Sequence, residues 1–227
     1  MWRFLSLAFC IIHITASTAT AEEEKSPRLP KVVLVGDSIR LSYAPRVTQQ
    51  LAGNATIISP KANGGDSSNV LKHLDQWVIR EKPDVVHFNC GIHDTKKFIS
   101  TGKFQISPEQ YEENLREIVK RIRQETDAVV LFATSTPILD QRAAAARKGR
   151  AYELLGTSIE QYNEIAVRVM RELGVPIDDL HHAMVEPDAL HESKDLIGKD
   201  GVHLTETGVE LVGTTVAAFI AERVGPS

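Results

Sequence analysis

The sequence is poor in cysteine and has no surplus of positive charge, and each shortage excludes a class of protein. It holds only 2 cysteines among 227 residues, too few for the disulfide framework that stabilises many small extracellular domains. Lys and Arg number 26 against 30 Asp and Glu, and the formal net charge of −4 argues against a nucleic-acid-binding surface. The 42% hydrophobic and 25% charged residues exclude a disordered or low-complexity chain and favour one globular domain.

The apolar run near the N-terminus is too short to cross a membrane. Phe4 to Ile14 is mostly apolar but is shorter than the roughly 20 residues that a span needs. Arg3 before this run and Ala19-Thr20-Ala21 after it have the charge and the small side chains of a secretory signal peptide. We therefore expect residues 1–21 to be a signal peptide cleaved after Ala21, and the mature chain to be secreted or periplasmic. An uncleaved anchor is the alternative.

The mature chain alternates short apolar runs with helical patterns. Residues 22–30 are charged and end in proline, which is typical of a tail, so a single domain is expected over residues 31–227. Lys31 to Val35 is a β-branched run bounded by Gly36, as in a buried strand. Similar runs predict further strands over Ala55 to Ile58, Val85 to Cys90, Ala128 to Ala133 and, more weakly, Val175 to Ile177.

Helices are predicted between these strands. Ser107-Pro108-Glu109-Gln110 is a capping box with proline at the first helical position. Helical spacing also predicts helices over 158–173, with Gly174 as the stop, and from Thr205 onward. The alternation predicts an α/β protein, a three-layer α/β/α sandwich with about five parallel strands. Ligands in such folds bind at the carboxyl ends of the strands, so the chemistry is expected there.

Two separated segments carry side chains suited to nucleophilic catalysis. Gly36-Asp37-Ser38 follows the first predicted strand, which places Ser38 at the carboxyl end of that strand near the start of a helix. The same Asp-Ser pair is also typical of a simple helix cap. In Asp200-Gly201-Val202-His203, the carboxylate can hold one ring nitrogen while the other accepts a proton from a serine. We predict a catalytic set of Ser38, Asp200 and His203, with a surface turn at Asp200-Gly201 as the alternative.

These segments resemble the sequence blocks of the SGNH or GDSL hydrolases. Val35-Gly36-Asp37-Ser38 is similar to the first block, which carries the nucleophile, and Asp200 with His203 is similar to the last. Asn63-Gly64-Gly65 resembles the second block, and Gly91-Ile92-His93-Asp94 resembles the third. The four occur in the family's order and span nearly the whole mature chain. The resemblance implies a flavodoxin-like sandwich, in agreement with the periodicity, and an activity on esters.

The third block departs from the family pattern at His93, where the family usually has an asparagine. The resemblance implies an oxyanion hole made of the N–H groups of Ser38 and Gly65 together with the side chain at position 93. A neutral imidazole can donate one N–H, so we predict that His93 takes the place of the asparagine. The alternative is that the hole has lost one donor, which typically costs roughly 2.7–4 kcal/mol of transition-state stabilisation.

We expect an exported serine esterase that removes short acyl groups, acetyl above all, from a carbohydrate without a metal or an organic cofactor. Its expected partner is a small-molecule or glycan ester, and neither nucleic acid nor stable membrane insertion is expected. The altered third block leaves a different class open, a carbohydrate-binding protein that has lost turnover. A phosphodiester or sulfate hydrolase is another alternative, and it would normally need metal ligands. The sequence leaves the natural substrate and the oligomeric state open.

Two smaller features have structural interpretations. A group of histidines and aspartates lacks the spacing of metal ligands and is more typical of a polar loop, namely Asp178, Asp179, His181, His182 and His191. Cys90 closes an apolar run and is expected to be a small core residue.

The stretch from Leu139 to Gly156 is longer than a simple connection and follows a predicted strand. It carries Arg142, Arg147, Lys148 and Arg150 around four alanines. This composition favours a solvated helix face. The alternative is a lid over the site whose cations attract an acidic polysaccharide.

Overall fold

The computed structural model describes residues 28–186 and 192–224, so the predicted signal peptide and its cleavage site lie outside the described residues. Five strands form one parallel sheet in the spatial order β2 (Thr56–Ile58), β1 (Lys31–Val35), β3 (Val85–Phe88), β5 (Val129–Ala133) and β7 (Ile177–Asp178). The predicted α/β sandwich with about five parallel strands is confirmed. The last strand begins at Ile177 rather than Val175, because the Val175 N–H donates to the Met170 carbonyl and closes the preceding helix.

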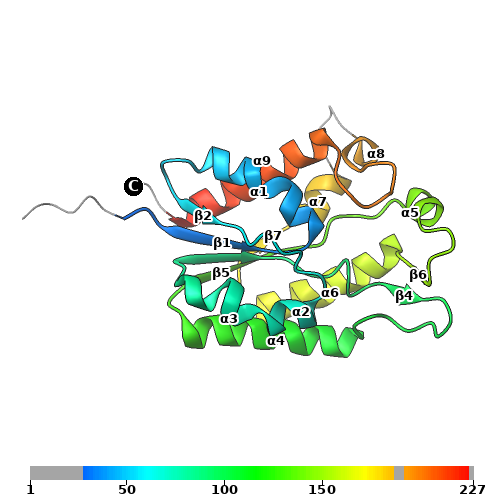
Figure 1. Ribbon diagram of the computed structural model, residues 1–227, viewed down its shortest axis with the longest axis horizontal. Helices are drawn as coiled ribbons and strands as arrows, with labels where there is room; N and C mark the ends of the chain where they lie inside the picture. Colours follow the sequence, from blue (N-terminus) through cyan, green and yellow to red (C-terminus); the bar gives the residue numbers. More distant parts are fainter. Residues whose placement is uncertain (1–27, 187–191, 225–227) are drawn as a thin grey trace, which may run out of the picture.

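Helices cover both faces of the sheet (Figure 1). On one side lie α1 (Ser38–Gln50) and α9 (Glu206–Val224). On the other lie α2 (Ser67–Lys72), α3 (Leu74–Trp77), α4 (Pro108–Glu125) and α6 (Gly156–Glu172). Each face of the sheet carries its own hydrophobic core. Along β1, Val32 and Leu34 pack in the core on the side of α1 and α9, whereas Val33 and Val35 pack in the core on the side of α4 and α6. A strand buried on both faces needs the continuous apolar run that the sequence has there.

The capping signal before α4 is confirmed. The Ser107 side chain accepts a hydrogen bond from the Gln110 N–H at 3.3 Å, and Pro108 is the first helical residue. The apolar side of the helix is buried as its spacing predicts, through Tyr111, Leu115, Ile118, Val119 and Ile122. This burial holds α4 against the sheet, beside the loop that leaves β3.

The remaining elements lie mostly beyond the carboxyl edge of the sheet, on the right of Figure 1. They are β4 (Lys97–Phe98), α5 (Asp140–Ala146), β6 (Tyr152–Glu153), α7 (Leu180–Val185) and α8 (Ser193–Leu196), whereas the short helical turn Ile79–Glu81 follows α3. The strands β4 and β6 pair antiparallel, with Phe98 opposite Tyr152. Among the described residues, no helix combines the length and the apolar character of a membrane span.

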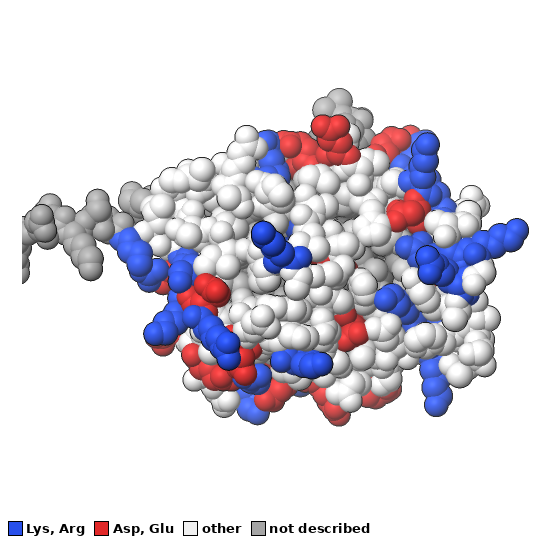
Figure 2. Space-filling model, in the orientation of Figure 1, with Lys and Arg blue, Asp and Glu red and all other residues white. Residues whose placement is uncertain are grey.

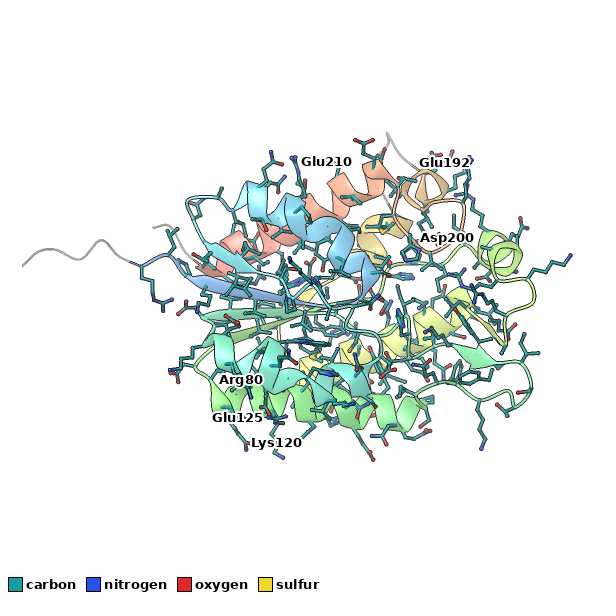
Figure 3. The ribbon with its side chains drawn as sticks, in the orientation of Figure 1. Arg80, Lys120, Glu125, Glu192, Asp200 and Glu210 are labelled. Carbon is teal, nitrogen blue, oxygen red and sulfur yellow. The ribbon has the colours of Figure 1, made fainter. Side chains whose placement is uncertain are left out.

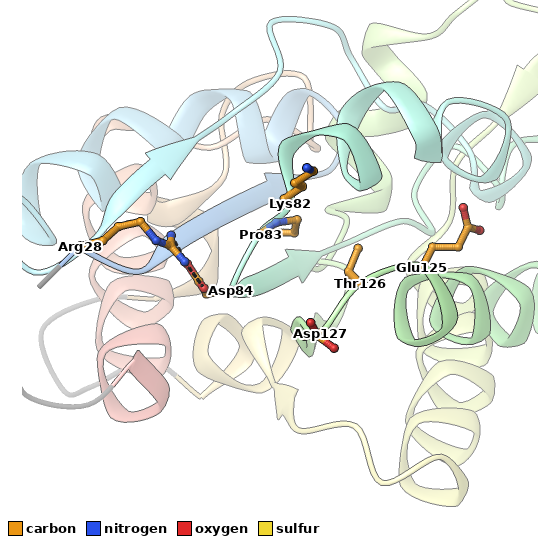
Figure 4. A pocket seen from close by; sticks show the side chains of 7 residues that line it. All are labelled: Arg28, Lys82, Pro83, Asp84, Glu125, Thr126 and Asp127. Atoms are coloured by element: carbon orange, nitrogen blue, oxygen red, sulfur yellow. Dashed lines mark hydrogen bonds and ion pairs between the residues drawn. The ribbon is translucent and has the colours of Figure 1, made fainter.

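A pocket of about 340 Å³ lies at the other edge of the sheet, near the amino ends of β3 and β5 (Figure 4). Arg28 forms an ion pair with Asp84 there at 2.8 Å, and the Asp84 carboxylate also accepts from the Lys31 N–H at 2.6 Å. The hydrogen bond from Arg28 lowers the pKa of Asp84. These contacts join the start of β1 to the residue just before β3, so Arg28 and Asp84 in this pocket serve to hold the two strands together.

Candidate active site

Ser38 is the first residue of α1 and follows β1 after a two-residue turn. Asp37 caps this helix, because its side chain accepts from the Ile39 N–H at 2.9 Å. The cap interpretation of the Asp-Ser pair is therefore correct for Asp37, and it places Ser38 where helix N–H groups have no intrahelical acceptor. Burial raises the pKa of the Asp37 carboxyl, although the nearby His93 and the Ile39 N–H act in the opposite direction.

The structure brings Ser38 together with the loop that precedes α9. The Ser38 Oγ lies 2.9 Å from the His203 Nε2, although 165 positions separate the two residues in the chain. The His203 Nδ1 lies 2.5 Å from the Asp200 Oδ2. The three side chains thus form one hydrogen-bonded chain in which the imidazole can accept the serine proton.

Asp200 is fixed by its own loop. Its Oδ1 accepts from the N–H groups of Val202 and His203 at 3.1 and 3.0 Å, while Oδ2 faces the imidazole. Partial burial would raise the pKa of Asp200, but the hydrogen bonds from His203 and Val202 outweigh it and lower the pKa to about 2. The carboxylate is therefore ionised at any pH near neutrality and selects the tautomer with the proton on Nδ1.

The site is open to solvent. The side chain of His203 is 53% exposed and that of Asp200 is 36% exposed. Figure 3 shows Asp200 at the carboxyl edge of the sheet, far from Arg80, Lys120 and Glu125 at the other end of the molecule. A molecule in solution can therefore reach these two side chains without prior opening of the fold.

The predicted second block lies against Gly36 and Asp37, the turn before the predicted nucleophile Ser38, which we call the nucleophile turn. The Gly64 N–H donates to the Gly36 carbonyl at 2.9 Å, and a Cβ at Gly64 would stand 2.7 Å from that oxygen, so only glycine fits. Gly65 has φ +64°, and its N–H donates to the Asn63 Oδ1 at 2.9 Å. The Gly65 N–H is thus near the nucleophile turn but is held by a side chain of its own loop.

Arg40 holds this loop in place and was not singled out by its sequence pattern. It lies on α1, only 1% exposed. Its guanidinium donates to the carbonyls of Gly36, Pro60 and Ala62 at 2.9, 2.6 and 2.7 Å. Burial lowers the pKa of Arg40, and nearby Asp37 acts against this shift. Arg40 therefore connects the nucleophile turn to the residues just before Asn63.

The third block lies on the loop that leaves β3, and it presents His93 as a half-buried side chain. Burial lowers the pKa of His93, and the charge of Lys96 lowers it further, whereas Asp37 and Asp66 raise it. The charge of His203 also acts on the His93 imidazole. His93 is thus within reach of the charges of Asp37, which adjoins Ser38, and of His203.

Asp94, the neighbour of His93, ties this loop to α2. It is fully buried and accepts from the Ser67 N–H at 3.0 Å and from the Ser67 hydroxyl. Burial raises the pKa of Asp94 to about 7 in spite of these hydrogen bonds. Since Asp66 caps α2 directly after Gly65, the bond joins the second block to the third.

This buried carboxyl predicts a pH dependence of stability. Asp94 ionises near pH 4 in an unfolded chain and near 7 in the folded protein, so between these values the folded state binds one more proton. Its contribution therefore falls as pH rises from 4 to 7. Urea titrations at pH 5 and 7.5 would measure this fall. We expect the free energy of unfolding to decrease between these pH values by roughly 1–4 kcal/mol less in Asp94→Asn than in the wild type. Equal slopes in both proteins would contradict the shift.

Two arginines of the stretch after β5 hold the segment that carries Asp200 and leads to His203. Arg142 donates to the carbonyls of Lys194 and Ile197 at 2.8 and 2.6 Å, and Arg147 donates to the Asp200 carbonyl at 2.9 Å. The expectation of a fully solvated helix face is thus wrong for these two arginines, because orphaned loop carbonyls draw them inward. Lys148 and Arg150 are exposed. Figure 2 shows Lys and Arg side chains gathered at this end of the molecule.

The other predicted features are distributed as follows. Cys90 is completely buried, as expected of a core residue, and burial raises the pKa of its thiol. Asp178 lies in β7 beside the buried His87, and Asp179 caps α7. His191 lies outside the described residues. Within 28–186 and 192–224, no group of three or more His, Cys, Asp or Glu side chains is placed to hold a metal ion.

Comparison with known proteins identifies the family. The profile of the GDSL-like Lipase/Acylhydrolase family matches residues 34–211, a span that contains Ser38, Asp200 and His203. The chain belongs to this family of carboxylic ester hydrolases, also called SGNH hydrolases. A search among curated proteins found no match.

Solved structures share the fold. A lipase/acylhydrolase from Enterococcus faecalis is 25% identical with a TM-score of 0.72, covering 88% of this chain and 99% of the other. The acetyl xylan esterase AlAXEase is 17% identical with a TM-score of 0.68, covering 84% and 100%. Axe2, an acetylxylan esterase from Geobacillus stearothermophilus, is 17% identical with a TM-score of 0.65, covering 87% and 95%. The two esterases are similar to this chain in fold alone.

Proposed function

We propose that the protein is an exported serine esterase that removes acetyl or other short acyl groups from a carbohydrate. The observation that carries the catalytic part is the hydrogen-bonded chain from the Ser38 Oγ through His203 to Asp200. A carbohydrate-binding protein that had lost turnover would have no need to keep this geometry. The proposal of export rests on the signal-like pattern of residues 1–21.

The reaction proceeds in two halves. The Ser38 Oγ attacks the ester carbonyl carbon while His203 Nε2 takes the hydroxyl proton, and the imidazolium is stabilised by the Asp200 carboxylate. The tetrahedral intermediate collapses with loss of the alcohol, which receives the proton from His203. Water then attacks the acyl-serine while His203 takes one of its protons. The second tetrahedral intermediate expels the Ser38 Oγ, which receives that proton from His203, and the carboxylic acid leaves.

The oxyanion is assigned to the N–H groups of Ser38 and Gly65 and to the side chain of His93. The Ser38 N–H begins a helix and so points toward developing negative charge. The Gly65 N–H now donates to Asn63, which is exposed, so rotation of the Asn63 side chain would free this donor. An oxyanion is the stronger acceptor of the two, which favours the exchange.

Substitution of His93 tests whether the imidazole replaces the family's asparagine. We expect His93→Asn to keep most of kcat, because asparagine also offers an uncharged N–H donor. His93→Ala is expected to lose about ten-fold or more in kcat, roughly 1.4 kcal/mol in activation free energy. Steady-state kinetics on p-nitrophenyl acetate would measure both. Equal kcat in the wild type and His93→Ala would show that the hole does without this side chain.

Two features support a short acyl group on a bulky alcohol. The side chains of His203 and Asp200 are exposed, so a polymer can reach them. Two fold relatives bear the name acetyl xylan esterase. Nucleophilic attack by Ser38 and proton transfer by His203 complete the reaction, so the proposal includes no metal or organic cofactor.

A substrate series tests the proposal. We expect hydrolysis rates of p-nitrophenyl esters to fall steeply beyond short acyl chains, and acetate release from acetylated xylan to exceed that from a Ser38→Ala blank. Activity should persist after dialysis against a chelator, whereas a metal-dependent phosphodiester or sulfate hydrolase would lose it. Binding of the glycan without acetate release, together with no hydrolysis of any ester, would favour the non-catalytic alternative.

A further inference from the structure

Lys96 makes a contact with His93 that fixes the state of the imidazole. The Lys96 Nζ lies 3.0 Å from the His93 Nδ1, three residues earlier on the same loop. A lysine ammonium can only donate hydrogen bonds, so the Nδ1 must be the acceptor and carry no proton. The proton of the neutral ring is then on Nε2. Because the two nitrogens lie on opposite sides of the ring, this N–H faces away from Lys96.

Tyr152 holds the ammonium group from another element. The Lys96 Nζ lies 5.4 Å from the centre of the Tyr152 ring, within the range of a cation–π interaction. Tyr152 belongs to β6, whose pairing with β4 places it opposite Phe98. Lys96 directly precedes β4, and its carbonyl accepts from the Gln105 N–H at 2.8 Å. Both the backbone and the ammonium group of Lys96 are therefore anchored.

Burial disfavours protonation of His93, whereas the charges around it act in both directions. Asp37 at the start of α1 and Asp66 at the start of α2 raise the pKa of His93. Lys96 and His203 oppose them from the same loop and from the loop before α9. A second imidazolium beside His203 would make His203 a weaker base for the Ser38 proton. A neutral His93 with an Nε2–H avoids this conflict and still provides a donor.

We propose that Lys96, braced by Tyr152, is a positioning residue that holds His93 as the neutral Nε2–H tautomer with its donor turned toward the oxyanion. This inference rests on the proposed esterase function. The chain departs from its family at His93, and the inference assigns Lys96 the role of supporting this residue. Asparagine always has an N–H to donate, whereas histidine needs a neighbour to fix the position of its proton. The pair His93 and Lys96 would act together as one donor.

A double-substitution cycle tests the pair. We expect Lys96→Met to lower kcat for p-nitrophenyl acetate by about three- to ten-fold with KM changed less than two-fold, because the contact acts in the transition state. In the His93→Asn background, where no tautomer needs fixing, the same change should alter kcat by less than about two-fold. Lys97→Met is the matched control, since it removes the same charge one residue away.

The tautomer itself gives a readout that does not depend on activity. In protein with ¹⁵N-labelled histidine, the His93 signals are assigned by their loss in His93→Asn. We expect a protonated Nε2 and an unprotonated Nδ1 in the wild type, and a mixed or protonated ring in Lys96→Met. The acid limb of kcat/KM should also move to higher pH in Lys96→Met, because loss of the cation raises the pKa of His93.

The outcomes separate failure of this inference from failure of the proposed function. Equal kcat losses for Lys96→Met and Lys97→Met, or a full loss retained in the His93→Asn background, would overturn the positioning role. A His93 proton on Nδ1 in the wild type would also overturn it. If instead no ester is hydrolysed by any variant while the Nε2–H tautomer depends on Lys96, the esterase proposal fails and the structural contact stands without a catalytic purpose.

Discussion

Ser38→Ala is expected to lower kcat for p-nitrophenyl acetate by about 10⁴-fold or more. The substitution removes the hydroxyl oxygen that lies 2.9 Å from the His203 Nε2, so the covalent acyl-enzyme cannot form. Ser38 is a half-buried residue at a helix start, and alanine fits there, so the fold should persist. Stopped assays with enzyme in large excess would detect the residual rate.

Ser42→Ala is the matched control for this loss. Ser42 lies one turn further along α1, where its hydroxyl donates to the Ile39 carbonyl at 2.6 Å and makes no contact with His203. We expect kcat of Ser42→Ala to stay within about two-fold of the wild type. A Ser38→Ala protein that kept even a tenth of wild-type kcat would contradict the assignment of the nucleophile.

Asp200→Asn is expected to lower kcat by roughly 10³–10⁴-fold while leaving the loop folded. The asparagine oxygen can still accept from the Val202 and His203 N–H groups, as Oδ1 of the aspartate does. Its amide then donates to the His203 Nδ1, which leaves the proton on Nε2 and removes the base that faces Ser38. The loss is therefore a tautomer effect rather than a loss of structure.

Asp195→Asn controls for the change of charge. Asp195 is exposed on α8, which packs against α9 near the loop that carries Asp200 and His203. The substitution likewise removes one negative charge. We expect kcat within about two-fold for this variant. Since hydrogen bonds hold the pKa of Asp200 near 2, the wild-type acid limb above pH 4 should not arise from this carboxyl. An Asp200→Asn protein within ten-fold of wild-type kcat would contradict the proton relay.

The strands of the sheet and the two segments that form the hydrogen-bonded chain of Ser38, His203 and Asp200 could be predicted because their signals are local. The β-branched runs at Lys31–Val35 and Val129–Ala133 need no partner to be read as buried strands. The capping residues before α4 are contiguous in the chain. Since parallel strands end at one edge of a sheet, Ser38 after β1 is expected at that edge. His203 follows no strand directly, and the loop before α9 brings it to Ser38.

Other parts of the site depend on tertiary contacts that leave no pattern in the sequence. Arg40 reads as a polar residue at a helix start, yet it is buried because three loop carbonyls need a donor. Lys96 reads as one cation among several, and only the folded loop sets it between His93 and Tyr152. The bond from the Gly65 N–H to Asn63 likewise appears only with the turn in place.

Arg142 and Arg147 are side chains that the composition predicts as solvated but that tertiary contacts turn inward. An alanine-rich run with spaced cations is typical of a solvated helix, and Lys148 and Arg150 fit that expectation. The two arginines instead donate to carbonyls of the loop that carries Asp200. Which cation turns inward depends on where the unpaired carbonyls of a distant segment lie, and composition does not encode that.

Mass spectrometry after reaction with a p-nitrophenyl alkylphosphonate tests most directly whether Ser38 is an activated nucleophile. Attack by the Ser38 Oγ on phosphorus expels p-nitrophenolate and leaves a stable phosphonyl-serine. We expect one adduct per chain, on the peptide that contains Ser38, with none in Ser38→Ala and a strongly slowed reaction in His203→Ala. An adduct on another residue, or equal labelling of the wild type and Ser38→Ala, would contradict the proposed mechanism.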